Sequence, residues 1–485
     1  MSINNLLNLK KAQIRIFPFH TNDTSFILYN DLPTSYLLSL LIWKLWFNLN
    51  QFVFDYVYHT KKYIDKTLIN LSDYKEDYFI FYLENYYHSS NYAMWFLSLV
   101  LDKIEELETK PHIIIHTIKT PSEEIKKLIE KYDFILLVVN WDFEEFFYKL
   151  FWNNSPIEEI SNIYYRDDSW KIYINEKANV VSDLDNYVLP AYASKYYTNF
   201  AKSKDYVISM LDEDDETTDK DIYYKRPKEQ VIESFRYSSE TAVMLTTWRW
   251  CKYNCSYCYR WVKYSAVRQI SLETIKKDLD YLSELKYEYV YLYDDCFITT
   301  NMDRLEALVD LLSKYDFVYW ISVRFEVCNS KVLDILSRIN IQRIQIWLQS
   351  ISIEVNKETK RWFNKKMFED VVSRVTNLWI NISLDLIIWL PWEWLKWFLK
   401  TFNYAVSLNP SSIHINTLFL NPWTELYAKQ KEYWIITNND KTTRNLFHVK
   451  PVISSNDFTQ KDIKMAKTYV SYYINKLKNI DIILR

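Results

Sequence analysis

The sequence contains no glycine, although an average usage of about 7% would place roughly 34 glycines in a chain of this length. It contains 19 tryptophans instead, and several occupy glycine-type positions: Trp248, Trp250, Trp261, Trp389, Trp392 and Trp423. Turns that need a positive φ accept glycine and reject a bulky indole. We therefore hypothesise that these tryptophans are UGA codons that the source organism reads as glycine, as some bacteria do. The alternative is that all 19 are genuine tryptophans.

Cysteine, net charge and long apolar runs are also scarce. The five cysteines all fall between residues 251 and 328, which argues against a disulfide framework and favours a reducing compartment. The net charge of −3, without a long basic run, does not indicate a nucleic-acid partner. The most apolar stretch, residues 35–49, is interrupted by Lys44 and is too short to span a bilayer comfortably. No secretory leader is recognisable, so we expect a cytoplasmic protein without a membrane span.

Three of the five cysteines form the most informative motif of the chain. Cys251, Cys255 and Cys258 follow one another with C-x3-C-x2-C spacing. An iron–sulfur cube held by three thiolates keeps one iron open to a small ligand, as catalytic clusters require. A structural zinc site is the alternative, but it wants four ligands, and no histidine lies close by in the sequence.

The segment around these cysteines, TTWRWCKYNCSYCYRW, resembles that of radical S-adenosylmethionine (SAM) enzymes. Read with glycine for tryptophan, IIWLPWEW at 387–394 and NPWTELY at 421–427 also resemble strings of that superfamily. The resemblance implies a 4Fe–4S cluster on the three cysteines, whose open iron binds SAM and whose electron generates a 5′-deoxyadenosyl radical. It places Tyr257 beside the SAM adenine, and it implies an electron donor such as flavodoxin or ferredoxin.

From residue 241 onward, strand-like and helix-like runs alternate. Strands are expected within 290–295, 317–326, 341–352 and 380–393, with helices such as DRLEALVDLLSKY and KVLDILSRI between them. Such β/α units, with their chemistry at the strand carboxyl ends, indicate a partial (β/α)6 barrel that is open on one side. We assign this radical SAM domain to residues 237–440, followed by a helical C-terminal extension over 441–485.

The resemblance also suggests residues for the SAM site. Gln349 and Ser350 are expected near SAM. Asp385, or the backbone around Ile388 to Leu390, is expected to contact the ribose or adenine of SAM. Arg324 is a candidate for the SAM carboxylate, because a guanidinium fork matches that anion. The paired carboxylates Asp294 and Asp295 are expected to orient SAM or to touch substrate. The alternative for these residues is an ordinary helix cap or ion pair.

The first 185 residues predict a different α/β domain. Runs at 77–83, 112–118 and 134–140, each followed by a helical pattern, indicate a doubly wound parallel sheet. This half resembles the Rossmann-like cobalamin-binding domain that precedes the radical SAM domain in one subfamily. The D-x-H-x-x-G cobalt-ligating loop is absent, so a sheet that has lost cobalamin and serves as a platform remains an alternative. Residues 186–236, which contain the acidic run DEDDETTDKD, read as a solvated linker.

Together these features predict a radical SAM enzyme of the cobalamin-binding subfamily, acting as a transferase or oxidoreductase. C-methylation and rearrangement of a small-molecule or peptide substrate both fit. The first 250 residues contain no cysteine, which disfavours methylthiotransferases, and none follows Cys328, which disfavours SPASM-type peptide-modifying enzymes. A catalytically silent Fe–S/SAM-binding regulator or assembly partner is the alternative, and a zinc module is a weaker one. Cys296 and Cys328 read as small buried residues.

Overall fold

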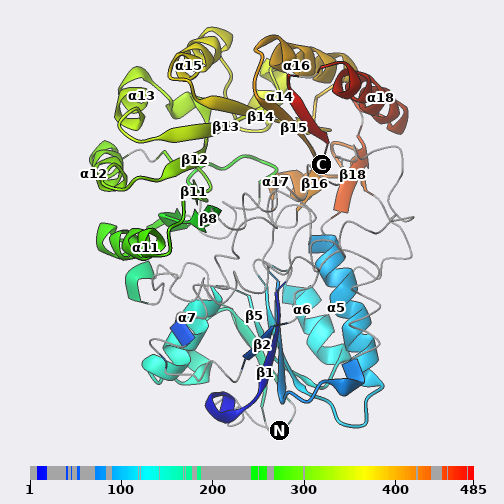
Figure 1. The fold of residues 1–485 in the computed structure, drawn as a ribbon. Coiled ribbons are helices and arrows are strands. Elements are labelled where there is room, and N and C mark those ends of the chain that lie inside the picture. Colours follow the sequence, from blue (N-terminus) through cyan, green and yellow to red (C-terminus); the bar gives the residue numbers. More distant parts are fainter. Residues whose placement is uncertain are drawn as a thin grey trace. The chain divides into compact units, whose positions relative to one another are not determined.

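A computed structural model of the 485-residue chain divides it into two compact units, residues 1–215 with 440–449 and residues 216–439 with 450–485 (Figure 1). The structure describes residues 8–18, 40–41, 45, 52–54, 71–83, 90–117, 120, 122–140, 142–167, 169, 171–176, 183–186, 242–249, 251–258, 267–298, 301–421, 424–437, 450–455, 457–477 and 479–484. The acidic run 212–221 and most of the apolar stretch 35–49 lie outside these residues, as do Trp141, Trp170, Trp250, Trp261 and Trp423.

The first unit is built on a seven-stranded sheet with the order β2-β1-β3-β4-β5-β6-β7. The strands are β1 (Ile14–Pro18), β2 (Phe52–Phe54), β3 (Tyr78–Tyr82), β4 (His112–His116), β5 (Ile135–Val139), β6 (Ile163–Arg166) and β7 (Ile172–Asn175). The first five are parallel, in the 2-1-3-4-5 order of one doubly wound fold class. The predicted parallel sheet is therefore confirmed.

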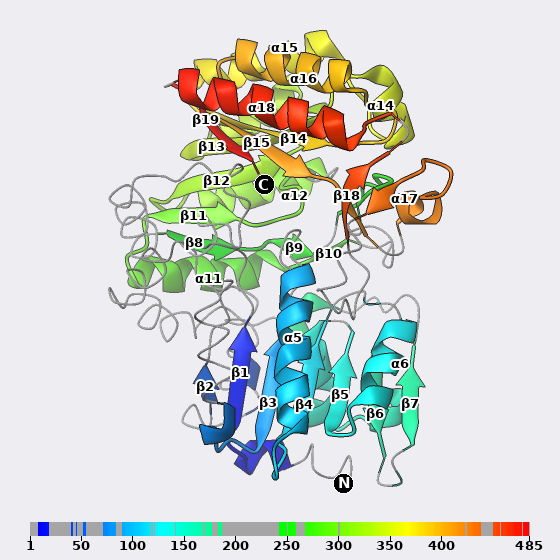
Figure 2. The ribbon, with the colours of Figure 1, turned by 90° about the vertical axis from the view of Figure 1, so that its right-hand side faces the viewer.

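Helices cover both faces of this sheet. In Figure 1, α5 (Ser90–Glu105) and α6 (Ser122–Lys131) lie on one side of it and α7 (Phe143–Phe147) on the other, and Figure 2 shows α5 and α6 across the row of strands. Apolar side chains from β3, β4, β5, α5 and α6 form one buried cluster, which includes Phe79, Phe81, Leu101, Ile115, Leu128 and Val138. Strands β6 and β7 follow in the chain and extend the sheet in the antiparallel direction.

The second unit contains a seven-stranded parallel sheet with the order β19-β15-β14-β13-β12-β11-β8. These strands are β8 (Ala242–Leu245), β11 (Tyr289–Leu292), β12 (Val318–Val323), β13 (Ile341–Gln349), β14 (Asn381–Ile388), β15 (Ser412–Thr417) and β19 (Asp481–Leu484). Among the described strands, β8 and β19 are the two edges, so the barrel is open, as expected.

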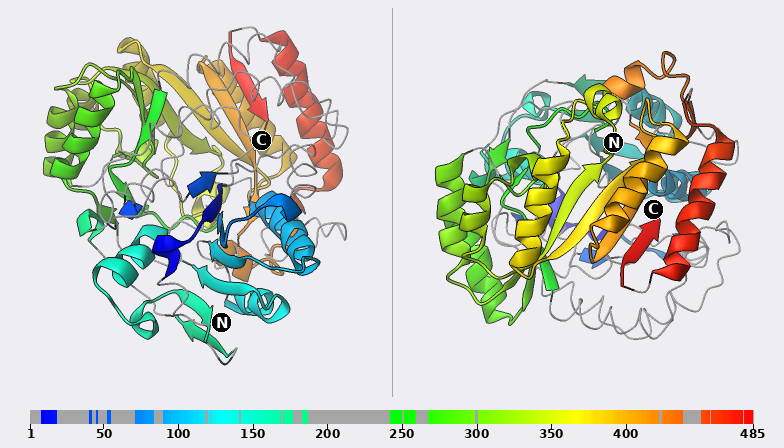
Figure 3. Two further views of the ribbon diagram at one scale, coloured as in Figure 1. Left: turned by 60° about the horizontal axis from the view of Figure 1, so that its bottom comes forward. Right: turned by 90° about the horizontal axis from the view of Figure 1, so that it is seen from above.

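Helices lie along the outside of this curved sheet (Figures 1 and 3). They are α11 (Leu272–Glu284), α12 (Met302–Leu312), α13 (Ser330–Leu336), α15 (Lys365–Asn377), α16 (Leu395–Ser407) and α18 (Gln460–Lys476). Several begin at a residue whose side chain accepts a hydrogen bond from the first helical turn, including Ser271 for α11, Asn301 for α12 and Asn364 for α15. These caps satisfy backbone N–H groups that the helix itself leaves unpaired.

The C-terminal segment differs from the helical extension that the sequence predicted. Residues 460–476 form α18 as expected, but Lys450–Ser454 form β18, and Asp481–Leu484 form β19 alongside β15. The physical reason is the exposed edge of β15, whose unpaired backbone groups are satisfied by the short apolar run DIIL. Within the described residues, no helix is long and apolar enough to cross a membrane.

Candidate functional site

The cysteine loop begins just beyond β8 and β9 (Trp248–Arg249), at the carboxyl edge of the second sheet. Its centre is held by two backbone hydrogen bonds: Ser256 N donates to the Thr359 carbonyl at 3.2 Å, and Leu426 N donates to the Ser256 carbonyl at 2.9 Å. Cys258 N donates to the Cys255 carbonyl at 2.9 Å, which closes a turn between the two cysteines. Contacts with two distant chain segments therefore fix the loop.

Asp294 fixes residues 246–248, which lead into this loop. Its buried carboxylate accepts hydrogen bonds from Thr246 Oγ1 at 3.0 Å, Thr247 N and Thr247 Oγ1 at 2.7 Å each, and Trp248 N at 3.1 Å. Burial raises the pKa of Asp294 to about 6, against the opposing effect of the Thr247 and Trp248 hydrogen bonds. In the structure this carboxylate ties β11 to the end of β8. The contact with SAM or substrate that the sequence suggested stays a prediction.

Cys251 and Tyr257 of the loop are shielded from solvent to different degrees: Cys251 is half-buried and Tyr257 is buried. Burial raises the pKa of the Cys251 thiol, and the nearby negative charge of Asp295 raises it further. Tyr257 is buried, which raises the pKa of its phenol, and its carbonyl accepts a hydrogen bond from Asn421 Nδ2 at 3.5 Å.

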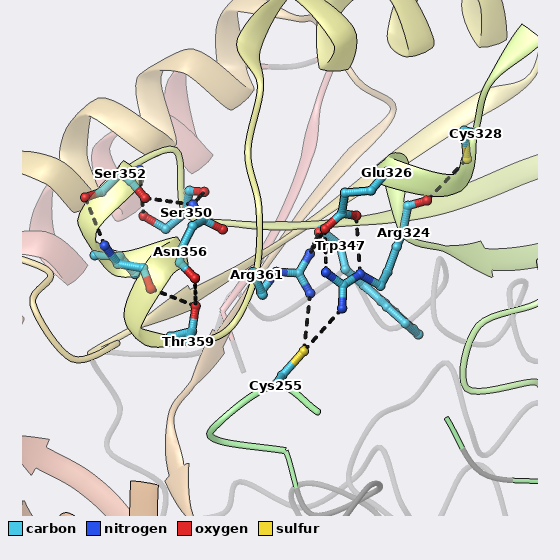
Figure 4. A network of polar contacts seen from close by, with 11 residues as sticks. Cys255, Arg324, Glu326, Cys328, Trp347, Ser350, Ser352, Asn356, Thr359 and Arg361 are labelled. Atoms are coloured by element: carbon cyan, nitrogen blue, oxygen red, sulfur yellow. Dashed lines mark hydrogen bonds and ion pairs between the residues drawn. The ribbon is translucent and has the colours of Figure 1, made fainter. Parts of the chain in front are cut away.

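Cys255 points at two buried arginines (Figure 4). Arg324 Nη1 lies 3.4 Å from Cys255 Sγ, and Arg361 Nη1 lies 3.9 Å from the same sulfur. Glu326 joins the two guanidinium groups, with its Oε1 2.5 Å from Arg324 Nη2 and 3.9 Å from Arg361 Nη2. The Arg324 guanidinium also stacks 4.0 Å above the centre of the Tyr253 ring, within the cysteine loop. Arg324, a candidate for the SAM carboxylate, thus contacts a cysteine and Glu326.

A second polar group gathers where β13 and β14 end. Ser350 Oγ donates to Glu393 Oε1 at 2.7 Å, and both side chains are buried. Burial raises the pKa of Glu393 to about 8, although the bond to Ser350 opposes the shift. Gln349, with a φ of 63°, is also buried. Among the described residues nothing hydrogen-bonds to Gln349 Oε1 or Glu393 Oε2, although both atoms are buried.

Asp385 lies lower in the sheet, in the middle of β14. Its carboxylate accepts a hydrogen bond from Gln345 Nε2 at 2.6 Å and lies 3.1 Å from His414 Nδ1. Ser322 Oγ donates a hydrogen bond to Gln345 Oε1 at 3.0 Å, and the Ser322 and Tyr291 hydroxyl groups are hydrogen-bonded to each other at 3.0 Å. The result is a polar row across five adjacent strands, β11 to β15.

The structure therefore brings Cys255, Arg324 and the previously unsuspected Arg361 and Glu326 together, and separately pairs Ser350 with Glu393. Glu393 had a sequence signal, since it ends the glycine-like string IIWLPWE. Arg361 and Glu326 carried none. Within the part of the chain that the structure describes, no group of three or more His, Cys, Asp or Glu side chains is gathered as a metal site. The three cysteines remain a predicted ligand set.

The segment that contains the cysteine loop, the two arginines and Glu393 matches a known protein family. The family model of the Radical SAM superfamily matches residues 245–405, which run from the end of β8 into α16. This segment is a radical SAM domain. Such a domain implies a 4Fe–4S cluster and SAM. The residues here suit both groups, since three thiols stand on one loop, guanidinium groups face the middle thiol, and buried polar atoms lack partners among the described residues.

Solved structures extend the likeness of fold to nearly the whole chain. The cobalamin-dependent SAM radical enzyme OxsB, with aqua-cobalamin bound, has a TM-score of 0.61 and 15% identity, covering 97% of this chain and 68% of that one. The radical SAM methyltransferase TsrM from Kitasatospora setae, with cobalamin and a [4Fe-4S] cluster bound, has a TM-score of 0.57 and 11% identity. That match covers 88% of this chain and 76% of TsrM. The radical SAM domain and its preceding α/β unit thus share the fold of these cobalamin-dependent proteins.

Curated relatives match a smaller part. The protein named heme chaperone HemW is 25% identical over 196 residues in Buchnera aphidicola subsp. Schizaphis graminum (strain Sg) and 23% identical over 228 residues in Buchnera aphidicola subsp. Acyrthosiphon pisum (strain APS). These matches cover 37% and 42% of this chain. They span 51% and 60% of the relatives' own length.

Proposed function

We propose that this protein is a radical SAM enzyme in which Cys251, Cys255 and Cys258 hold a 4Fe–4S cluster. When bound, the cluster supplies the electron that reductively cleaves SAM. The observation that carries the proposal is the position of the cysteine loop, which is fixed at the carboxyl edge of a parallel sheet with Cys255 facing two buried guanidinium groups. The two guanidinium groups place positive charge beside a cysteine whose ligand form is the anionic thiolate.

The surrounding residues have separate tasks in this proposal. Asp294 holds the strand that feeds the loop, because its carboxylate binds backbone and hydroxyl groups on three successive residues. Gln349 and Glu393 offer buried polar atoms to SAM at the ends of β13 and β14, with Ser350 orienting Glu393. The protein contributes positioning and exclusion of water, whereas the cofactors supply the difficult chemistry.

We further propose that the first unit, within residues 1–185, binds cobalamin and that the enzyme is a methyltransferase or another radical-based transferase. In doubly wound sheets, ligands bind outside the carboxyl ends of the strands where the strand order reverses. Here that position is between β1 and β3. OxsB and TsrM, which share the fold, are cobalamin-bound proteins. His116 is not a candidate cobalt ligand, because it is buried and stacks on Phe143 with ring centres 5.0 Å apart.

The first test is an anaerobic SAM-cleavage assay. The protein is reconstituted with iron and sulfide, reduced with dithionite and assayed for 5′-deoxyadenosine, both as the printed sequence and with Trp248→Gly, Trp389→Gly and Trp392→Gly combined. We expect 5′-deoxyadenosine from a protein with four irons bound, and its loss with the cluster in Cys255→Ala. The control is Cys328→Ala, which removes a buried thiol that donates to the Arg324 carbonyl instead of facing the arginine pair. Cluster assembly that survives Cys255→Ala would contradict the ligand assignment.

Cobalamin is tested on the same samples. Reconstituted protein is passed over a desalting column with added hydroxocobalamin, and the absorbance of the retained corrinoid is measured. Retention of about one equivalent supports a cobalamin enzyme. A protein that forms 5′-deoxyadenosine but retains no corrinoid would contradict this part and favour a sheet that serves as a substrate or partner platform.

A second candidate is a catalytically silent Fe–S/SAM-binding protein. The observation that favours it is the curated name of the sequence relatives, heme chaperone, which denotes a binding role for those proteins. A cluster that forms without SAM cleavage, together with retention of hemin by the purified protein, would favour this candidate. Zinc in place of iron in protein purified without reconstitution would favour a structural metal module.

A further inference from the structure

We propose that Arg361, paired with Arg324 on Cys255, sets the reduction potential of the cluster by placing uncompensated positive charge beside one of its ligands. The inference rests on the proposed function, because it requires a cluster on Cys255. It assigns a task to Arg361, which neither the sequence motifs nor the family match singles out. Figure 4 shows both guanidinium groups directed at the sulfur from the same side.

Arg361 is held in place without help from the cluster. Its side chain is 2% exposed, and Nη2 donates to the Trp347 carbonyl in β13 at 2.6 Å. The main chain around it is fixed by the bond from Arg361 N to the Asn356 carbonyl at 2.7 Å, at the end of α14 (Ile353–Glu358). The guanidinium therefore cannot swing into solvent, and its charge stays close to the sulfur.

The charged side chains of this network carry a net positive charge. Arg324 and Arg361 supply two positive charges, and Glu326 supplies one negative charge, with side-chain exposures of 6%, 2% and 12%. Removing a guanidinium group from water is costly unless a counter-charge accompanies it. One carboxylate for two arginines leaves one positive charge, and Cys255 Sγ lies within 3.4 Å and 3.9 Å of the two guanidinium groups.

The sign of the effect follows from electrostatics. Reduction adds one electron to the cluster, so a positive charge nearby stabilises the reduced form more than the oxidised form. Hydrogen bonds to cluster sulfurs and the net charge around them set the reduction potential in the same direction. Arg361 should raise the potential and ease electron entry from a biological donor, whereas Glu326 should lower it.

The test compares Arg361→Gln with Glu326→Gln in reconstituted full-length protein, by redox titration followed by electron paramagnetic resonance of the reduced cluster. At a fixed ambient potential, Arg361→Gln should lower the ratio of reduced to oxidised cluster at least tenfold, a shift of about 59 mV for one electron. Glu326→Gln should shift the ratio in the opposite direction. Opposite signs distinguish charge tuning from general disruption of the site, which would not reverse with the charge removed.

Two further variants complete the design. Arg361→Lys keeps the charge and should stay within threefold of the parent ratio, which retains a test if Arg361→Gln does not fold. Arg304→Gln is the matched control. Arg304 lies in the first turn of α12 and, like Arg361, donates a hydrogen bond to a backbone carbonyl, here that of Ile270. Failure of the parent to assemble a cluster would overturn the proposed function. A parent-like ratio in both Arg361→Gln and Glu326→Gln, with full iron content, would overturn this inference alone.

A separate observation concerns the tryptophans. We infer that positions 379, 389, 392 and 434 are glycine in the native protein, because the backbone there is left-handed. Their φ angles are 59° at Trp379, 79° at Trp389, 63° at Trp392 and 48° at Trp434. A bulky side chain at positive φ is a genuine outlier, whereas glycine adopts this conformation freely. Four such residues in one chain repeat the pattern expected for misread glycine codons.

The side chains support the same conclusion. The indoles of Trp379 and Trp434 are 94% and 70% exposed, so they contribute little packing. Trp389 is buried, but among the described residues nothing accepts a hydrogen bond from its Nε1. Trp320 differs, because it lies in β12 and its Nε1 donates to Gln342 Oε1 at 2.9 Å. The environment of Trp320 is that of a genuine tryptophan.

Peptide mass spectrometry of the protein purified from its source cells tests this inference. We expect glycine masses at positions 379, 389, 392 and 434, and UGA codons at the same places in the gene. Tryptophan masses at these four positions, or UGG codons there, would overturn it. The measurement is independent of cluster assembly and activity, so its outcome is separate from that of the proposed function.

Discussion

The two parallel sheets of this protein differ in what their faces contact. In the first unit, β5 is buried along its whole length, and helices cover both faces of the sheet. In the second unit, helices line the outside of the curved sheet, and its strands alternate between apolar and polar side chains. Alternate residues of a strand point to opposite faces, so the polar row from Tyr291 to His414 occupies the face away from the helices.

The first sheet therefore contributes mainly to stability, whereas the second sheet also carries the polar groups of the candidate site. A parallel sheet with both faces covered contributes mainly apolar burial. A sheet with helices along one face can carry hydrogen-bonding side chains on the other face and ligand-binding groups at its carboxyl edge. The cysteine loop, Gln349 and Glu393 all lie at that edge in the second unit. Substitutions in the two sheets should therefore have different consequences for folding and for cluster binding.

The largest expected effect is in the first sheet. Phe81 of β3 is fully buried in the apolar cluster, so Phe81→Ala should cost about 3–5 kcal/mol of unfolding free energy through lost burial and the cavity left behind. Hydrogen exchange should accelerate in β3, β4 and β5, while iron content after reconstitution stays at the parent level. Phe81→Leu is the control and should cost less. Loss of iron in parallel with the lost protection would contradict the separation of the two units' roles.

Much of this architecture followed from sequence pattern. The apolar runs of β3, β4 and β5 and the strand β12, which ends just before Arg324, were predicted because β-branched and aromatic residues cluster there between helical repeats. The cysteine loop was identified from spacing alone, since three thiols within eight residues have few structural explanations.

Other features depended on tertiary contacts that no local pattern encodes. Arg361 reaches Cys255 across 106 residues of sequence, and Asp294 binds residues 46 to 48 positions before it. Strand β19 has a short apolar run that was indistinguishable from the end of a helix, and its pairing depends on the free edge of β15. Long-range charge pairing and edge pairing are set by the folded chain, so the sequence predicted the loop and Arg324 but neither Arg361 nor Glu326.

Glu393, at the carboxyl edge of the second sheet, should make the stability of the protein depend on pH. Burial raises the pKa of Glu393 from its ordinary value of 4.5 to about 8, so the folded state binds its proton more tightly than the unfolded state does. Stability from this group is complete below about pH 4.5 and is lost as the pH rises through 8. Glu393→Gln cannot titrate and should remove about 4 kcal/mol of that pH-dependent loss, since each pKa unit corresponds to about 1.4 kcal/mol. Guanidinium unfolding at pH 5, 6.5 and 8 measures the change.

The matched control for this measurement is Glu273→Gln on α11. Its side chain is 78% exposed and pairs with Lys277 on the helix surface, so the pH dependence of stability should remain that of the parent. Asp294, with its pKa raised to about 6 by burial, still contributes a loss between about pH 4 and 6 in every sample. An unchanged loss between pH 6.5 and 8 in Glu393→Gln would show that this carboxyl does not titrate there.

The third prediction tests Asp294 as the brace of the cysteine loop. Asp294→Ala removes the acceptor of four hydrogen bonds, and each bond to a charged acceptor contributes about 1.5–3 kcal/mol. Burial already penalises the carboxylate, so we expect a net loss of about 2 kcal/mol together with reduced iron binding. Thermal unfolding and iron analysis measure the two effects. Asp294→Asn, which keeps one acceptor oxygen, should retain more iron, and equal iron loss in both variants would argue against the brace.

The smallest expected effect lies outside the polar face. Ser271 caps α11, where its Oγ accepts a hydrogen bond from Thr274 N at 3.1 Å, and Ser271→Ala should cost about 1 kcal/mol. Ser271→Asp, which also accepts this bond, should stay close to the parent stability. Because α11 lies on the helix-covered side of the sheet, the reduced cluster spectrum should be identical in both variants. A changed spectrum in Ser271→Ala would show that the covered face also communicates with the cysteine loop, and the contrast between the two faces would fail.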